Sequence, residues 1–110
     1  MKTVLVLAPH PDFAELVRSA LNPDEYRIIH RTGIEDAEPF LNQGLLDACL
    51  IDAAAGNVEA IWTLERVRRQ MPHCPVVLYT EAKPWEWEEE AYLQGVRHVV
   101  RGREPAWREQ

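Results

Sequence analysis

The chain has 110 residues, 46% of them apolar, and a formal net charge of −6 at pH 7. This length suits one domain with a modest core, and the acidic balance argues against non-specific binding to nucleic acid. No apolar run reaches the ~18 residues of a membrane span, and residues 1–7 are too short an apolar run for a signal peptide. We therefore expect a single cytoplasmic domain over residues 1–110, with neither nucleic acid nor membrane as a partner.

The first half of the chain alternates between strand and helix patterns. Thr3 to Leu7 is a continuous apolar run, which predicts a central strand. Helical spacing begins at Asp12, which we expect to cap that helix. Tyr26 to Arg31 predicts a second strand, and a helix that begins at Ile34 is expected to close at Gly44.

The second half repeats the alternation. The run from Asp47 to Asp52 predicts a strand buried on both faces. A helix over Val58 to Met71 should bury every third or fourth side chain, Ile61, Leu64 and Val67, and expose Glu65, Arg66, Arg68 and Arg69. The remaining predicted elements are a strand over Pro75–Thr80, a helix over Pro84–Gln94, a strand over Val96–Arg101 and a shortened fifth helix over Glu104–Gln110.

Five successive strand-helix units predict an α/β domain. Such domains contain a parallel sheet with helices on both faces, joined by right-handed crossovers. Ligands bind at the carboxyl ends of the strands in these sheets. Asp52 ends the third predicted strand and is followed by small residues, so it lies where chemistry would be expected.

The two cysteines and four histidines do not form a recognisable ligand set. Cys49 lies in a predicted buried strand and Cys74 in a loop flanked by proline. Their spacing fits neither a metal site nor a disulfide framework, so we expect both to be reduced. The histidines fall in four separate segments, and the sequence predicts no metal site from them.

This pattern resembles the receiver domain of bacterial response regulators, the CheY-like family, along essentially the whole chain. The resemblance implies a flavodoxin-like three-layer sandwich, with a five-stranded parallel sheet of order 2-1-3-4-5 and a last helix that is short or truncated. Asp52 falls on the family's phosphoacceptor position and Thr80 on its switch position. Pro11 matches the proline that follows the first strand, and residues 90–96 resemble the end of the fourth helix.

Other signature positions of the family are altered. Ala8 and Pro9 stand where two acidic residues hold Mg²⁺, Val99 stands at the aromatic switch position, and Gly102 stands where a lysine contacts the phosphoryl group. Carboxylate attack on phosphorus depends on neutralising negative charge. We therefore expect Mg²⁺ to bind weakly or not at all, and we expect neither a cofactor nor enzymatic activity.

The resemblance and these departures together indicate a degenerate receiver, or pseudo-receiver, in a two-component phosphorelay system. It would act through protein-protein contacts with a histidine kinase or with the output domain of a parent protein, of which it could be the N-terminal part. The alternative is a working switch with Asp52 as phosphoacceptor, in which Arg101 and Arg103 beside Gly102 supply positive charge.

The short carboxyl end predicts association. Only residues 104–110 remain for the fifth helix, and Trp107 is its one large apolar residue. Bare apolar surface is usually an interaction site. We expect a homodimer, or contact with the parent protein, through the fourth helix, fifth strand and fifth helix, with aromatic contacts from Trp85 or Trp87, Tyr92 and Trp107.

Two further functions are weighed and disfavoured. Residues 7–12, with Glu15, resemble the His-Pro-Asp-Asp-Glu signature of zinc-dependent sugar N-deacetylases of the PIG-L type. The second aspartate of that signature is Phe13 here, and no later His-x-x-His follows, so the zinc site would be incomplete. An anion- or nucleotide-binding flavodoxin-like domain would need a glycine-rich phosphate loop, but residues 8–12 contain no glycine.

Overall fold

The computed structural model describes residues 1–43, 46–53, 58–80 and 88–101. Five parallel strands pair in the order β2-β1-β3-β4-β5. The predicted α/β class and the strand order implied by the resemblance are therefore confirmed. The elements are β1 (Lys2–Leu7), α1 (Pro11–Ala20), β2 (Tyr26–Arg31), α2 (Ile34–Gln43), β3 (Ala48–Asp52), α3 (Val58–Gln70), β4 (Val76–Thr80), α4 (Glu88–Leu93) and β5 (His98–Arg101).

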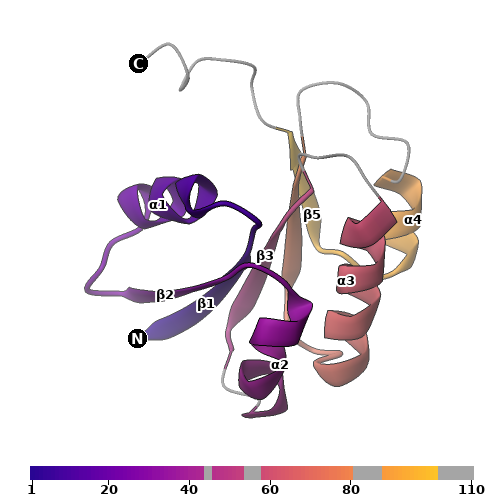
Figure 1. The fold of residues 1–110 in the computed structure, drawn as a ribbon, viewed down its shortest axis with the longest axis horizontal. Helices are drawn as coiled ribbons and strands as arrows, with labels where there is room; N and C mark the ends of the chain where they lie inside the picture. The colour runs from indigo at the N-terminus through magenta and orange to yellow at the C-terminus, as the bar shows by residue number, and fades with distance from the viewer. Residues whose placement is uncertain (44–45, 54–57, 81–87, 102–110) are drawn as a thin grey trace.

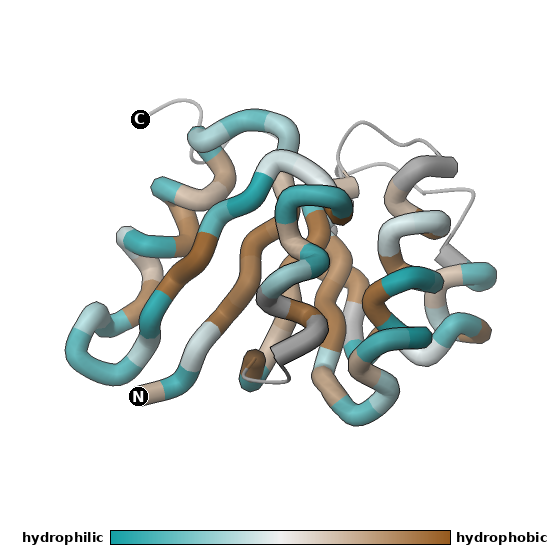
Figure 2. The backbone as a smooth tube through the Cα atoms, turned by 60° about the horizontal axis from the view of Figure 1, so that its bottom comes forward, coloured by the Kyte–Doolittle hydropathy of each residue, from teal (hydrophilic) through white to brown (hydrophobic). Residues whose placement is uncertain are grey.

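Helices on both faces of the sheet bury its apolar strands (Figure 1). On one face lies α1, where Ala14 joins a buried cluster formed by Val4, Val6 and Ala8. The hydropathy colouring shows brown strand segments running between helices in which teal and brown segments alternate (Figure 2). A larger cluster on the opposite face has buried members from the other helices: Ala37 and Leu41 of α2, Leu64 and Val67 of α3, and Ala91 of α4.

The start of α1 differs from the prediction. The helix begins at Pro11, and His10 is the N-cap without a side-chain hydrogen bond. Proline suits the first helical position because its ring fixes φ and the missing N–H would have no partner there. The predicted cap at Asp12 is therefore wrong. Asp12 lies in the first turn, where the helix dipole favours a negative charge.

Asp47 precedes β3 and braces it against β1. The carboxylate of Asp47 accepts a hydrogen bond from the backbone N–H of Thr3 at 2.7 Å. In return, the N–H of Asp47 donates to the carbonyl of Thr3 at 2.8 Å. The first aspartate of the predicted strand therefore has a structural role, since it joins β3 to β1.

The carboxyl end of α3 contacts the turn that leads to β5. Arg68 was predicted to point outward, but it is half-buried, and its guanidinium donates to the carbonyl of Cys74 at 3.2 Å. Gly95 has φ of +90°, a conformation that favours glycine, and a Cβ there would lie 3.2 Å from Arg68 Nε. Arg68 is half-buried because its side chain lies across this turn.

Several predicted features fall outside the described residues. These are the helix end at Gly44, the start of the fourth helix at 84–87, Gly102, Arg103, the fifth helix at 104–110 and the tryptophans Trp85, Trp87 and Trp107. The fifth strand begins at His98 instead of Val96, because the backbone of Val96 bonds to the carbonyl of Ala91 in the preceding turn. Among the helices of the described part, none has the length and apolar character needed to cross a bilayer.

Candidate functional site

The candidate site lies at the carboxyl ends of β1, β3 and β4. The sheet order reverses between β1 and β3, the place where such folds form a crevice. Asp52 is the last residue of β3 and pairs in register with Tyr79 of β4. Thr80 is the last residue of β4 and is buried. The fold thus brings the predicted phosphoacceptor and switch positions to one edge of the sheet.

Ala8 and Pro9 occupy the two positions where the family has its acidic pair. Ala8 is 1% exposed and packs in the apolar cluster under α1, whereas Pro9 is exposed. The N–H of Ala8 donates to the carbonyl of Arg31 at 3.1 Å. The carbonyl of Ala8 accepts a hydrogen bond from His30 Nε2 at 2.9 Å. Both backbone groups of Ala8 are therefore bound to β2, and its side chain adds to the core.

His30 is a residue of this site that sequence patterns alone left without a role. Since a carbonyl only accepts, Nε2 of His30 must carry the hydrogen that binds Ala8. His30 pairs in register with Val6, whose side chain is fully buried. A polar residue at a strand position that faces a helix needs a hydrogen-bond partner. This rule could have indicated from the sequence that His30 needs a hydrogen-bond partner. It could not have identified Ala8 as that partner, because their contact depends on the pairing of β1 with β2.

An aromatic pair packs on the same edge. The rings of Phe13 and Tyr79 have centroids 4.9 Å apart and planes inclined at 40°. Phe13 belongs to α1 and Tyr79 to β4, so the contact reaches across β3 next to the register position of Asp52. Tyr79 thus packs against α1, and the pair adds apolar surface close to the candidate phosphoacceptor.

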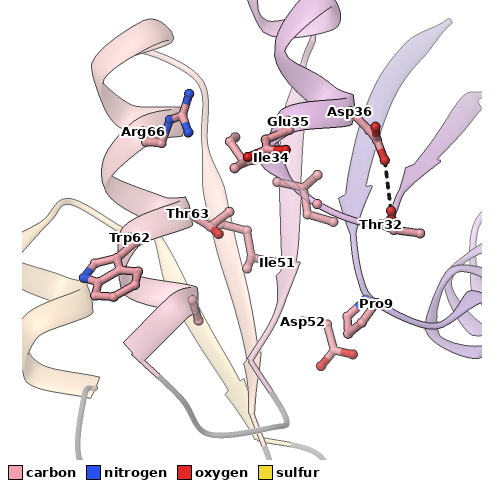
Figure 3. A pocket seen from close by; sticks show the side chains of 13 residues that line it. Pro9, Thr32, Ile34, Glu35, Asp36, Ile51, Asp52, Trp62, Thr63 and Arg66 are labelled. Carbon is pink, nitrogen blue, oxygen red and sulfur yellow. Dashed lines mark hydrogen bonds between the residues drawn. The ribbon is translucent and has the colours of Figure 1, made fainter.

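A groove of about 650 Å³ opens between α2 and α3 at this edge (Figure 3). Its apolar floor includes Leu7, Ile34 and Ile51. Asp52 and Pro9 lie together at one end, and Arg66 of α3 lies at the other (Figure 3). The remaining lining residues come from the start of α2 and from α3: Thr32, Gly33, Glu35, Asp36, Ala60, Trp62 and Thr63.

The described side chains of this groove do not fit a magnesium site. Protein-bound Mg²⁺ needs near-octahedral oxygen ligands, usually including one or two carboxylates beside each other. Asp36 accepts a hydrogen bond from the hydroxyl of Thr32 at 3.0 Å, and Arg66 pairs with Glu38. Within residues 1–43, 46–53, 58–80 and 88–101, no three or more His, Cys, Asp or Glu side chains are grouped to hold a metal. The acids line the groove without converging on one point.

The two thiols lie away from this chemistry. Cys49 and Cys74 are both buried and free. Burial raises the pKa of Cys49 well above its usual range, and the nearby Cys74 raises it further. Burial also raises the pKa of Cys74, assisted by the charge of Asp47 and opposed by Arg68. Neither thiol is a nucleophile at neutral pH, because the reactive form is the thiolate.

Comparisons with known proteins support the resemblance. No model of a known protein family matches the sequence. The chain is 26% identical to the transcriptional regulatory protein ComA of Bacillus subtilis over 104 residues, which are 91% of this chain and 49% of that protein. The chain thus spans about half the length of this relative.

Solved structures share the fold. A response regulator from Thermotoga maritima superposes with a TM-score of 0.81 at 19% identity, over 92% of this chain and 84% of that chain. A pilus assembly-related protein from Burkholderia pseudomallei superposes with a TM-score of 0.71 at 26% identity, over 92% and 78% respectively. The chain therefore has the fold of the response-regulator receiver domains, and the resemblance that its sequence predicts is confirmed.

Proposed function

We propose that this receiver-type domain signals through protein-protein contacts without a phosphorylation cycle at Asp52. The observation that carries the proposal is the burial and hydrogen bonding of Ala8. At the position where the family holds Mg²⁺ with a carboxylate, the chain has a side chain 1% exposed and a carbonyl bonded to His30. Without a bound cation, the charge that develops during phosphoryl transfer to Asp52 lacks its main stabiliser.

The partner in this proposal is another protein of a two-component system. It is either a histidine kinase or the output domain of a longer cytoplasmic parent protein, in which residues 1–110 form a single domain. The similarity to about half of ComA, a transcriptional regulatory protein, supports a multidomain parent. The same fold in a pilus assembly-related protein means that the fold by itself does not specify the output.

Treatment with acetyl phosphate and Mg²⁺ tests this function. We expect no mass increase in intact-protein mass spectrometry, because Ala8 and Pro9 occupy the two positions where the family has its Mg²⁺-binding acids. A phosphorylatable response regulator in the same reaction is the positive control, and the Asp52→Asn variant is the matched negative control. A gain of one phosphoryl group by the native chain that is absent in Asp52→Asn would instead establish the alternative, a working switch with Asp52 as phosphoacceptor.

We also propose that α4 and β5 form a contact face, for a second copy of the chain or for the parent protein. Tyr92, Leu93 and Val100 of these elements are exposed apolar residues, and Leu93 is 75% exposed. Light scattering at increasing concentration should show a dimer, and Leu93→Asp should weaken it at least tenfold, since burying an unpaired charge is costly. Trp62→Ser on α3, another exposed position, should leave it unchanged. A strict monomer at the highest concentration would rule out the dimer.

A further inference from the structure

The groove between α2 and α3 is negatively charged and yet is not a metal site. Among the lining residues that the structure describes, three are carboxylates, Glu35, Asp36 and Asp52, and one is a guanidinium, that of Arg66. Arg66 is paired with Glu38 of α2, so much of its charge is already compensated. A surface of this kind attracts cations and repels phosphate groups. A matching ligand is therefore positively charged.

The shape of the groove indicates the size of that ligand. Glu35 and Asp36 are first-turn acids of α2, where the helix dipole stabilises them. The helix dipole accounts for the presence of these two acids, but it does not account for the cavity beside them. The cavity of about 650 Å³ has an apolar floor that includes Ile34 and Ile51, and the acids are distributed around it (Figure 3). A ligand that fits has apolar carbons as well as positive charge, as arginine and lysine side chains do.

Trp62 distinguishes a peptide from a small molecule. Its side chain is at the α3 margin of the groove and is 59% exposed. In Figure 3 the indole extends along the outer side of α3, away from Asp36 and Thr32. A small molecule held between the helices would leave this ring in water. A segment that continues past the margin would cover it, and tryptophan is enriched among the residues that dominate protein interfaces.

We propose that this groove is a docking site for a basic segment of a partner protein. One arginine or lysine side chain of the segment lies on Ile34 and Ile51 with its charged end toward Glu35 and Asp36, and the continuing backbone covers Trp62. The net charge of −6 complements such a partner and would speed its association. The inference rests on the proposed function, since it identifies the chemistry of the partner that a contact-based signalling domain requires.

Titration of the isotope-labelled full chain with a defined peptide tests the site. The probe is an acetylated, amidated hexapeptide of alternating leucine and arginine, and its control is the same peptide with citrulline, a neutral isostere of arginine. Amide and indole NMR shifts should centre on Glu35, Ile51 and Trp62. Glu35→Gln and Trp62→Ala should each weaken binding about fivefold or more, the size expected for a central contact. Glu89→Gln, an exposed acid of α4, should change affinity less than about twofold.

Other outcomes would overturn the docking site. Shifts centred on Glu88, Glu89 and Glu90 would show general attraction to acidic helices, because α4 has as many acidic residues as α2. Equal binding of the citrulline peptide would remove the role of charge. Arginine amide binding as tightly as the hexapeptide would indicate a small-molecule site. An absence of shifts at millimolar peptide would exclude the site. No phosphate donor is used, so failure here is separate from phosphorylation at Asp52, which would contradict the proposed function alone.

Discussion

Replacing Ala8 with aspartate is expected to lower the free energy of unfolding by about 2 to 4 kcal/mol at pH 7. Ala8 is 1% exposed, the other buried members of its cluster, Val4, Val6 and Ala14, are apolar, and the nearby His30 Nε2 is already bonded to the Ala8 carbonyl. The family's acid would therefore enter an apolar core here. Urea unfolding followed by tryptophan fluorescence measures the loss of stability. Mg²⁺ at a concentration of about 10 mM is not expected to restore that stability.

The same variant should recover stability in acid. Burial disfavours the charged carboxylate, so the pKa of the new side chain in the folded state would lie above its unfolded value of about 3.9. The folded chain then binds the proton more tightly, and its stability falls as the pH rises through that range. The deficit at pH 7 should shrink toward pH 4.

Pro9→Asp is the matched control for this prediction. Pro9 adjoins Ala8 in sequence but is exposed, so a carboxylate there remains in water. Its effect should stay below about 1 kcal/mol. If Ala8→Asp unfolded at the same urea concentration as the native chain and gained Mg²⁺ affinity together with Pro9→Asp, the acidic-pair position would still be available. The proposal that this domain signals without phosphorylation at Asp52 would then lose the observation on which it depends.

Truncation of Leu64 to alanine is expected to cost about 2 to 5 kcal/mol. Leu64 lies in α3, is fully buried, and belongs to the larger core cluster between the sheet and α2, α3 and α4. Removing its methyl groups leaves a cavity that the rigid strands beneath cannot fill. The midpoint of urea unfolding should fall while the slope of the transition stays constant, which indicates lost stability without a change in the denatured state.

Leu93→Ala serves as its control. Leu93 belongs to the neighbouring helix α4 and is 75% exposed, so its truncation should change the unfolding free energy by less than about 0.5 kcal/mol in dilute solution. Equal losses in the two variants would mean that the core does not lie where the structure places it. A loss confined to Leu93→Ala at high concentration would point to the proposed contact face of α4 and β5.

The sequence by itself determined the order and type of the elements. The continuous apolar run in β1 and the buried face of α3 are local patterns, because side-chain periodicity depends on neighbours a few residues away. The placement of Asp52 and Thr80 at strand ends followed from the same patterns. Boundaries were less secure: at α1, the preference of proline for the first helical position moved the start from Asp12 to Pro11.

Only the tertiary structure decided the chemistry around Asp52. The hydrogen bond from His30 to Ala8 joins β2 to β1, the Phe13–Tyr79 contact joins α1 to β4, and the groove is formed by α2 and α3 together. The sequence alone does not distinguish the two aspartates at the ends of the β3 apolar run. Strand pairing places Asp47 against the backbone of Thr3 and Asp52 at the opposite edge of the sheet. Each of these facts depends on residues far apart in the chain, whose contact is set by packing and register and not by local pattern.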